Sequence, residues 1–346
     1  MAVLCYKTLL EPITHFLTGA VLARAGFNRQ TALATATMTL AAEAPDLDVF
    51  WGFKGPVYNF AHHRGFTHSF LGLILVSAVV TGFMYLIWRL RGRKTNIAGL
   101  PPRWGLLFLF SYIAGLSHIL LDFTNNYGVR PFWPFWEKWY SWDIVFIFEP
   151  ALYIILIGGL VLPLIFSPPN SALPRGRKFA LAALICLVLL YAFRDHEHRH
   201  AVNAVRQQQF QSGPPLRVSV YPYYWNLYKW YAVAETAGSF ATSDVDSRTG
   251  QLSQSELEYF PKPPETPATL AAKRSYLGRA YLSWAQYPLV TETPTGENTM
   301  VHFRDLRYDY PQLRGRIALS CSIELNKDLQ VVREFFGQRE QVPPVE

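Results

Sequence analysis

The chain has 346 residues, of which 50% are hydrophobic and only 16% are charged, and its formal net charge is +7. Soluble domains usually have about a quarter of their residues charged. The basic residues gather in short loops between apolar runs, which is how membrane topology is encoded, and no basic helix or aromatic stacking module suggests nucleic-acid binding. The composition therefore argues against a nucleic-acid-binding protein and indicates a membrane half followed by a polar half.

The first 194 residues contain a series of apolar segments that predict a multi-pass helical membrane bundle. Residues 66–88 are the clearest segment, since a helix of that length crosses a hydrocarbon core of about 30 Å. The first two segments are rich in Ala, Gly and Thr and are too short to be assigned as full spans. In chain order, the six expected helices are 13–25, 31–44, 66–88, 104–123, 144–166 and 179–193.

The basic residues predict the orientation of this bundle. They lie in loops 24–29, 89–103 and 175–178, which fall on one side of the membrane if the helices alternate in direction. That side is expected to be cytoplasmic. The C-terminal half would then lie outside, together with the aromatic segment 125–142, whose tryptophans suit the lipid headgroup level.

The remainder of the chain is predicted to be a soluble α+β domain with a mostly antiparallel sheet. Alternating β-branched and aromatic residues predict strands, and one amphipathic helix is expected at 268–285. We therefore expect a transmembrane helical domain with a metal site over residues 1–194 and an extracytoplasmic domain over residues 195–346. The predicted strands are 216–221, 229–235, 300–306, 317–325 and 330–336.

Acids and imidazoles occur at the ends of the apolar segments, where they are costly to desolvate and so indicate function. In the predicted topology, all of them reach the extracytoplasmic end of the bundle. Mixed carboxylate and imidazole ligands suit one or two divalent ions, with zinc as the first choice and manganese or iron as alternatives. The candidate metal ligands are His15, Asp46, Asp48, His62, His63, His68, His118 and Asp122.

Each of these residues has a plain structural interpretation when it is taken alone. His118 and Asp122 are four residues apart, so they share a helix face and could simply hydrogen-bond to each other. Asp46 and Asp48 could end a helix. His62 is as easily a neighbour of the site as a ligand. Taken together, they favour a metal site, because one cation accounts for several expensive polar groups at one membrane edge.

Five further residues are candidates for a catalytic role around such a metal. Glu43 could be another ligand or the general base. Arg64 could pair with a phosphate or hold a ligand carboxylate in place. Thr67, Ser69 and Asp143 could orient the imidazoles.

Four separated motifs carry a resemblance to a known family. Thr14-His15, Pro45-Asp46-Leu47-Asp48, His63 through Ser69 and His118 through Asp122 together resemble the bacterial YdjM-type inner-membrane metal-dependent hydrolases. This resemblance implies a multi-pass protein of the bacterial inner membrane with hydrolase activity. The His-x-x-x-Asp motif is also similar to one in zinc-dependent phospholipase C, which would favour phosphoesters. The doubled His62-His63 departs from the single-histidine pattern.

The function predicted from the sequence is a metal-dependent hydrolase at the extracytoplasmic bilayer surface. Its expected partners are the lipid bilayer and a lipid-like or phosphoester substrate, with no nucleic acid, and the sequence does not specify an oligomeric state. Two alternatives use the same residues. One is a metal ion transporter or sensor, and the other is a structural membrane protein in which the polar groups only hold helices together.

Overall fold

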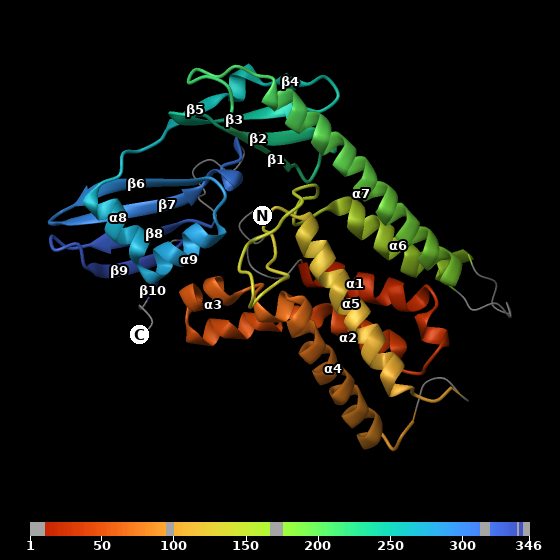
Figure 1. Ribbon diagram of the computed structural model, residues 1–346. Coiled ribbons are helices and arrows are strands. Elements are labelled where there is room, and N and C mark those ends of the chain that lie inside the picture. The colour runs from red at the N-terminus through yellow and green to blue at the C-terminus, as the bar shows by residue number, and fades with distance from the viewer. Residues whose placement is uncertain (1–10, 95–99, 167–175, 312–318, 338, 342–346) are drawn as a thin grey trace. The chain divides into compact units, whose positions relative to one another are not determined.

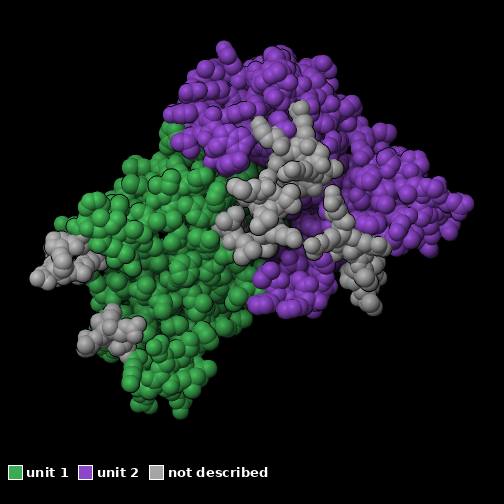
Figure 2. All heavy atoms as spheres, turned by 180° about the vertical axis from the view of Figure 1, so that it is seen from behind, with its two compact units in different colours: residues 1–48, 64–194 green, residues 49–63, 195–346 purple. Residues whose placement is uncertain are grey.

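The computed structural model describes residues 11–94, 100–166, 176–311, 319–337 and 339–341 (Figure 1). Contacts within the chain divide it into two compact units (Figure 2). Unit 1 comprises residues 1–48 and 64–194, and unit 2 comprises residues 49–63 and 195–346. The two units are described separately below.

Unit 1 is a helical bundle, so the predicted helical N-terminal region is confirmed. Two of its elements, η3 and α7, continue past the boundary into unit 2. The elements are α1 (Glu11–Arg24), η2 (Phe27–Arg29), α2 (Ala34–Glu43), η3 (Ala44–Lys54), η4 (Phe66–His68), α4 (Phe70–Leu90), α5 (Trp104–Thr124), α6 (Pro150–Phe166) and α7 (Arg177–Arg206).

Three of the described helices, α4, α5 and α7, are long and apolar enough to cross a membrane, judged by length and composition. Helix α6 has 17 residues and is shorter. It begins at Pro150, later than the expected start at position 144, because the amides of Ile144 and Val145 instead donate to the carbonyl of Thr124. The 66–88 segment also starts late, since residues Phe66–His68 form a separate 3-10 turn before α4.

Helices α1 and α2 pack closely together, as the small residues in both segments predict. Gly19 marks the closest approach. A Cβ atom at this position would lie 2.6 Å from the carbonyl oxygen of Met38 and 2.9 Å from the Cβ of Ala42, so only glycine fits. This contact fixes the C-terminal end of α2, which leads directly into the candidate site.

A buried core joins α2 to α4 and α5. Met38 from α2, Val80 from α4 and Phe110 from α5 are each almost completely buried in it. Burial of side chains of this size contributes about 1.5–3 kcal/mol each. The core therefore holds α2 against α4 and the N-terminal half of α5.

Unit 2 contains two five-stranded antiparallel sheets, which confirms the predicted α+β class with antiparallel pairing. The first sheet has the order β1-β2-β3-β4, with β5 also paired to β3, and the second has the order β10-β9-β8-β7-β6. The strands are β1 (Arg217–Pro222), β2 (Lys229–Glu235), β3 (Ser239–Asp246), β4 (Gln251–Leu252), β5 (Glu258–Pro261), β6 (Pro288–Thr295), β7 (Asn298–Asp305), β8 (Cys321–Leu325), β9 (Val331–Phe336) and β10 (Arg339–Gln341).

The prediction of a single helix at 268–285 is wrong, because the structure has two helices there. Helix α8 (Pro267–Arg274) ends at Ser275, and α9 (Tyr276–Trp284) begins directly after it. Ser275 has an extended backbone and its side chain accepts a hydrogen bond from the amide of Gly278, so it caps the second helix. Both helices lie against the β6–β10 sheet (Figure 1).

Residues 49–63 belong to unit 2 although they precede most of unit 1 in the sequence. They contain helix α3 (Pro56–His62), which packs against α9. The ring of Phe60 lies 5.4 Å from Trp284 and 4.8 Å from Phe336 between centroids, and it also stacks against Tyr281. We call residues 49–63 the arm. It is anchored by an aromatic side chain that is 6% exposed.

Replacing Phe60 with Ala tests this anchoring. Removal of a buried phenylalanine side chain costs about 3–5 kcal/mol in a packed core. We therefore expect unit 2 of the F60A variant to be cut faster by protease and to melt at a lower temperature than in the wild type. The matched control is Phe53→Ala, because Phe53 is 87% exposed in the same arm. Equal protease resistance of the two variants would contradict the anchoring.

Candidate metal centre

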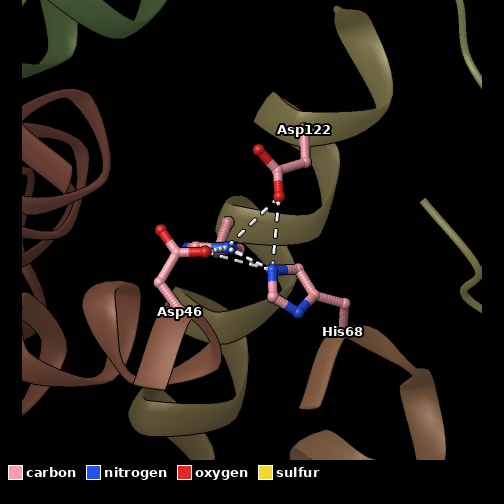
Figure 3. A group of neighbouring side chains, drawn as sticks. Asp46, His68 and Asp122 are labelled. Carbon is pink, nitrogen blue, oxygen red and sulfur yellow. Dashed lines mark hydrogen bonds and ion pairs between the residues drawn. The ribbon is translucent and has the colours of Figure 1, made fainter. Parts of the chain in front are cut away.

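Four side chains of unit 1 converge on one point and form a group that could hold a metal ion (Figure 3). Asp46, His68, His118 and Asp122 each offer one ligand atom, and these atoms lie within 4.8 Å of one another. We call these residues the four-residue cluster. Asp46 follows the end of α2, His68 precedes α4, and the last two lie near the C-terminal end of α5.

The spacing of the four ligand atoms fits a tetrahedral ion. Nε2 of His68 lies 3.3 Å from Oδ1 of Asp46 and 3.4 Å from Oδ2 of Asp122. Nε2 of His118 lies 3.4 Å and 3.3 Å from the same two oxygens, and the two Nε2 atoms are 3.0 Å apart. A zinc ion with ligands at about 2.0–2.1 Å requires tetrahedral edges of about 3.3–3.4 Å. The donor set and its dimensions therefore fit such an ion.

Hydrogen bonds on the far side of each imidazole orient it toward the cluster. Nδ1 of His118 lies 2.7 Å from the carbonyl oxygen of Ala42. A carbonyl can only accept, so Nδ1 carries the proton and Nε2 presents its lone pair to the cluster when the ring is neutral. The close packing at the end of α2 thus fixes the tautomer of a histidine on α5.

Asp48 has the corresponding role for His68. Its Oδ2 atom lies 3.3 Å from Nδ1 of His68. The same oxygen accepts hydrogen bonds from the Arg64 amide at 2.8 Å and the Thr67 hydroxyl at 3.3 Å. A carboxylate behind a histidine raises its basicity and fixes its orientation toward a metal. Asp48 lies behind the four-residue cluster and supports it.

Arg64 holds the carboxylate of Asp122. One guanidinium nitrogen lies 2.9 Å from Oδ1 of Asp122, and another donates to the carbonyl oxygen of Gly128 at 3.1 Å. The side chain is 2% exposed. Its backbone has φ of 54°, a left-handed conformation that is unfavourable for a residue with a Cβ. The hydrogen bond from its amide to Asp48 helps to hold this conformation.

The charges of these residues balance only when a cation binds or when the imidazoles take up protons. Asp46, Asp48 and Asp122 carry three negative charges, and Arg64 carries one positive charge, which leaves a net charge of about −2 while the imidazoles are neutral. Three of these four side chains are almost completely buried. Burial of unbalanced charge is costly. A divalent cation would neutralise the site.

His68 lies outside the candidate spans and shows the effect of this excess negative charge. Burial opposes its protonation, but hydrogen bonds with Asp122, Asp46 and Asp48 outweigh burial and hold its pKa well above the ordinary value. The carboxylates thus attract positive charge strongly. A proton and a metal ion would compete for the same nitrogen.

Glu43 is the last residue of α2 and lies beside the cluster. Burial and the charge of Asp46 raise the pKa of its carboxyl to about 7, although His118 acts in the opposite direction. Its Oε1 atom is buried and has no hydrogen-bond partner among the described residues. A carboxyl with this pKa is suited to proton transfer at neutral pH.

The other predicted ligands lie outside the four-residue cluster. His15 stacks on the ring of His118 at 3.7 Å between centroids. Its Nε2 lies 3.5 Å from Oδ1 of Asp122, the oxygen that also pairs with Arg64. His62 stacks on Tyr58 within the arm, and the His63 amide donates to Asn59 there. The structure thus brings His15 to the edge of the cluster and places the doubled histidines in unit 2.

The remaining catalytic candidates occupy different positions. Thr67 lies 3.0 Å from Nδ1 of His68 through its hydroxyl oxygen. The side chain of Ser69 accepts a hydrogen bond from the Gly72 amide and so caps α4. Asp143 lies in the loop between α5 and α6, with a positive φ of 60°.

Several supporting groups were not predicted from the sequence. The Ala42 carbonyl, the Asn125 side chain and the Gly128 carbonyl are polar contacts of His118 or Arg64. Backbone carbonyls leave no residue-type signal. Arg130 was also missed, although it is 7% exposed, lies over the ring of Trp139 and interacts electrostatically with Asp48. The sequence signal for Arg130 is that it is a lone arginine in the aromatic segment 125–142.

These features define a multi-pass membrane protein with a buried carboxylate–imidazole site that could hold a metal ion. The chain belongs to the family of YdjM inner membrane proteins, whose family model matches residues 10–201. It is also similar to the uncharacterized protein YfhP of Bacillus subtilis (strain 168), with 23% identity over 310 residues, which cover 88% of this chain and 86% of that protein. No solved structure matches the chain significantly.

The support that Asp48 gives to His68 can be tested with Asp48→Asn. The variant keeps the shape of the side chain but removes the charge behind the imidazole. Loss of such a partner lowers metal affinity by about 10–100-fold, which a zinc titration against a competing chelator would measure. The control is Asp195→Asn, because Asp195 pairs with Arg199 on α7. An unchanged zinc affinity in D48N would show that Asp48 does not orient His68.

Proposed function

We propose that this protein is a membrane-embedded, metal-dependent hydrolase, with zinc as the first candidate and manganese or iron as alternatives. The observation that supports this proposal is the four-residue cluster, in which two imidazole nitrogens and two carboxylate oxygens surround a point with an excess negative charge. Such a donor set suits these three metals, and the charge suits a divalent ion.

The exposure of the cluster favours catalysis over a purely structural role. Asp46 is 21% exposed, whereas His68, His118 and Asp122 are at most 1% exposed. Water and substrate would therefore approach on the Asp46 side. A bound divalent ion would polarise a phosphoryl oxygen and lower the pKa of water toward neutrality. Because four protein ligands fill a tetrahedral site, the attacking water would bind as a fifth ligand, an expansion that catalytic zinc sites show.

The surrounding residues have separate roles in this proposal. Glu43, with its pKa near 7, is the candidate general base for the attacking water. Asp48 and Thr67 keep His68 oriented, and Arg64 keeps the Asp122 carboxylate in place. Arg64 is thus committed to a ligand.

A phosphoester on a lipid or other amphiphile is the substrate class that we favour. The cluster lies at the ends of α4 and α5, close to where these spans would meet the headgroup region. An anionic ester would be attracted by the divalent ion. We assign the site and the C-terminal domain to the extracytoplasmic side, following the basic residues in the opposite loops.

The position of the cluster argues against a transporter. Transport sites usually lie near the midplane, where helices are interrupted. Here His68 precedes the first residue of α4, and Asp122 lies in the last turn of α5. Metal uptake by proteoliposomes that is lost in Asp122→Ala would favour the transporter over the hydrolase.

Metal content is the direct test of the cluster. We expect wild-type protein to contain about one zinc per chain by elemental analysis, whereas His118→Ala and Asp122→Ala contain almost none, because each removes a buried ligand. The matched control is His302→Ala, since His302 lies on β7 and contacts Thr293 and Ser322. Equal metal content in all four proteins would contradict the assignment of these ligands.

Turnover tests the hydrolase itself. We expect purified protein to cleave a phosphoester from a panel of phospholipids, isoprenoid phosphates and simple esters. The activity should disappear after chelation and return when zinc, manganese or iron is added. We expect Glu43→Gln to lower kcat by about 10²–10⁴-fold while the metal content is retained. Metal-loaded protein with no activity on the panel would contradict the proposed function.

A further inference from the structure

A groove on unit 1 runs along α2 to Glu43, which lies beside the candidate metal centre. It has a volume of about 580 Å³, and its walls are largely hydrocarbon. Leu33 lies toward one end, Ala36 and Leu40 lie along its length, and Phe16 and Glu43 lie toward the other end. A cavity of this size falls within the range of about 300–1,000 Å³ that holds small ligands.

The Glu43 end of the groove lies next to the site. Glu43 lines the groove, and it is near enough to Asp46 and His118 for their charges to shift the pKa of its carboxyl. The residue before it, Ala42, accepts the hydrogen bond that orients His118. A molecule lying in the groove would thus present one end to the four-residue cluster.

The helix that lines the groove is about as long as one leaflet of a bilayer is thick. Helix α2 has 10 residues, from Ala34 to Glu43, and so extends about 15 Å at 1.5 Å per residue. This is roughly half of the hydrocarbon thickness of about 30 Å. A hydrocarbon chain anchored at the site would therefore lie alongside α2 without leaving its leaflet.

We propose that this groove binds a single hydrocarbon chain of the substrate, with the phosphoester at its Glu43 end. The proposal rests on the proposed function and makes it narrower, since it requires an amphiphile with a long chain. The groove aligns the chain so that the head group meets the cluster from the Asp46 side, which is the exposed side of the site. A soluble phosphoester would lack this alignment and bind more weakly.

The test uses a variant that fills the groove from its outer side. Ala36 is exposed on α2 and lines the groove, so Ala36→Trp places an indole in it without entering the core. The matched control is Ala182→Trp, because Ala182 is exposed on α7. Zinc content equal to that of the wild type would show that both variants retain a folded site.

Binding is measured by native mass spectrometry of zinc-titrated protein released from maltoside micelles that contain dodecyl phosphate. We expect wild type and A182W to retain one dodecyl phosphate, and A36W to retain it about tenfold less, which corresponds to roughly 1.4 kcal/mol. Methyl phosphate, which has no chain, should bind all three proteins equally. Equal retention of dodecyl phosphate by A36W and wild type would overturn the groove proposal.

The two proposals fail in different ways. If the wild type retains dodecyl phosphate and A36W does not, but no ester is cleaved, the groove stands and the hydrolase fails. If the protein cleaves methyl and dodecyl phosphoesters with equal kcat/KM, the hydrolase stands and the groove is overturned. Loss of retention in A182W as strong as in A36W would show a general effect of tryptophan at the lipid-facing surface, and it would also overturn the groove.

Discussion

The arrangement of unit 1 depends on one electrostatic constraint, the balance of charge around buried carboxylates. Asp48 and Asp122 are almost fully buried, and a single guanidinium from Arg64 cannot neutralise them together with Asp46. Uncompensated charge in such a place is tolerated only when partners or a cation are present. Arg64 supplies part of the positive charge, and it does so from an unfavourable left-handed backbone conformation.

The constraint also explains why the site draws on three separate segments. No single helix offers enough ligands on one face, so the end of α2, the turn before α4 and the last turns of α5 each contribute. Apolar packing fixes these segments first. The close contact at Gly19 sets the end of α2, and the Ala42 carbonyl then selects the tautomer of His118. The groove along α2 is lined by the same helix and reaches Glu43 beside the site.

Periodicity and charge were enough to predict the six α-helices of unit 1 and five strands, because those segments have strong apolar patterns. The helix α3 and the division into α8 and α9 were not predicted. Strand β6 was missed since Pro288 and Pro294 argue against a strand, and they are tolerated because β6 is an edge strand. The cluster residues were all among the predicted ligands, and this assignment remains a prediction until metal is measured. The sequence did not separate them from His62, because only the tertiary fold shows that the arm belongs to the other unit.

The arm gives the chain an unusual linkage between its parts. Its two ends are held together where the Arg64 amide donates to Asp48, while Phe60 near its C-terminal end packs against Tyr281 and Trp284 of α9. A shortened protein that lacked both sheets would leave that ring in water at the tip of a loop. Removal of unit 2 would therefore require a different sequence between Asp48 and Arg64. We expect the sequences of the two units to have changed together for this reason.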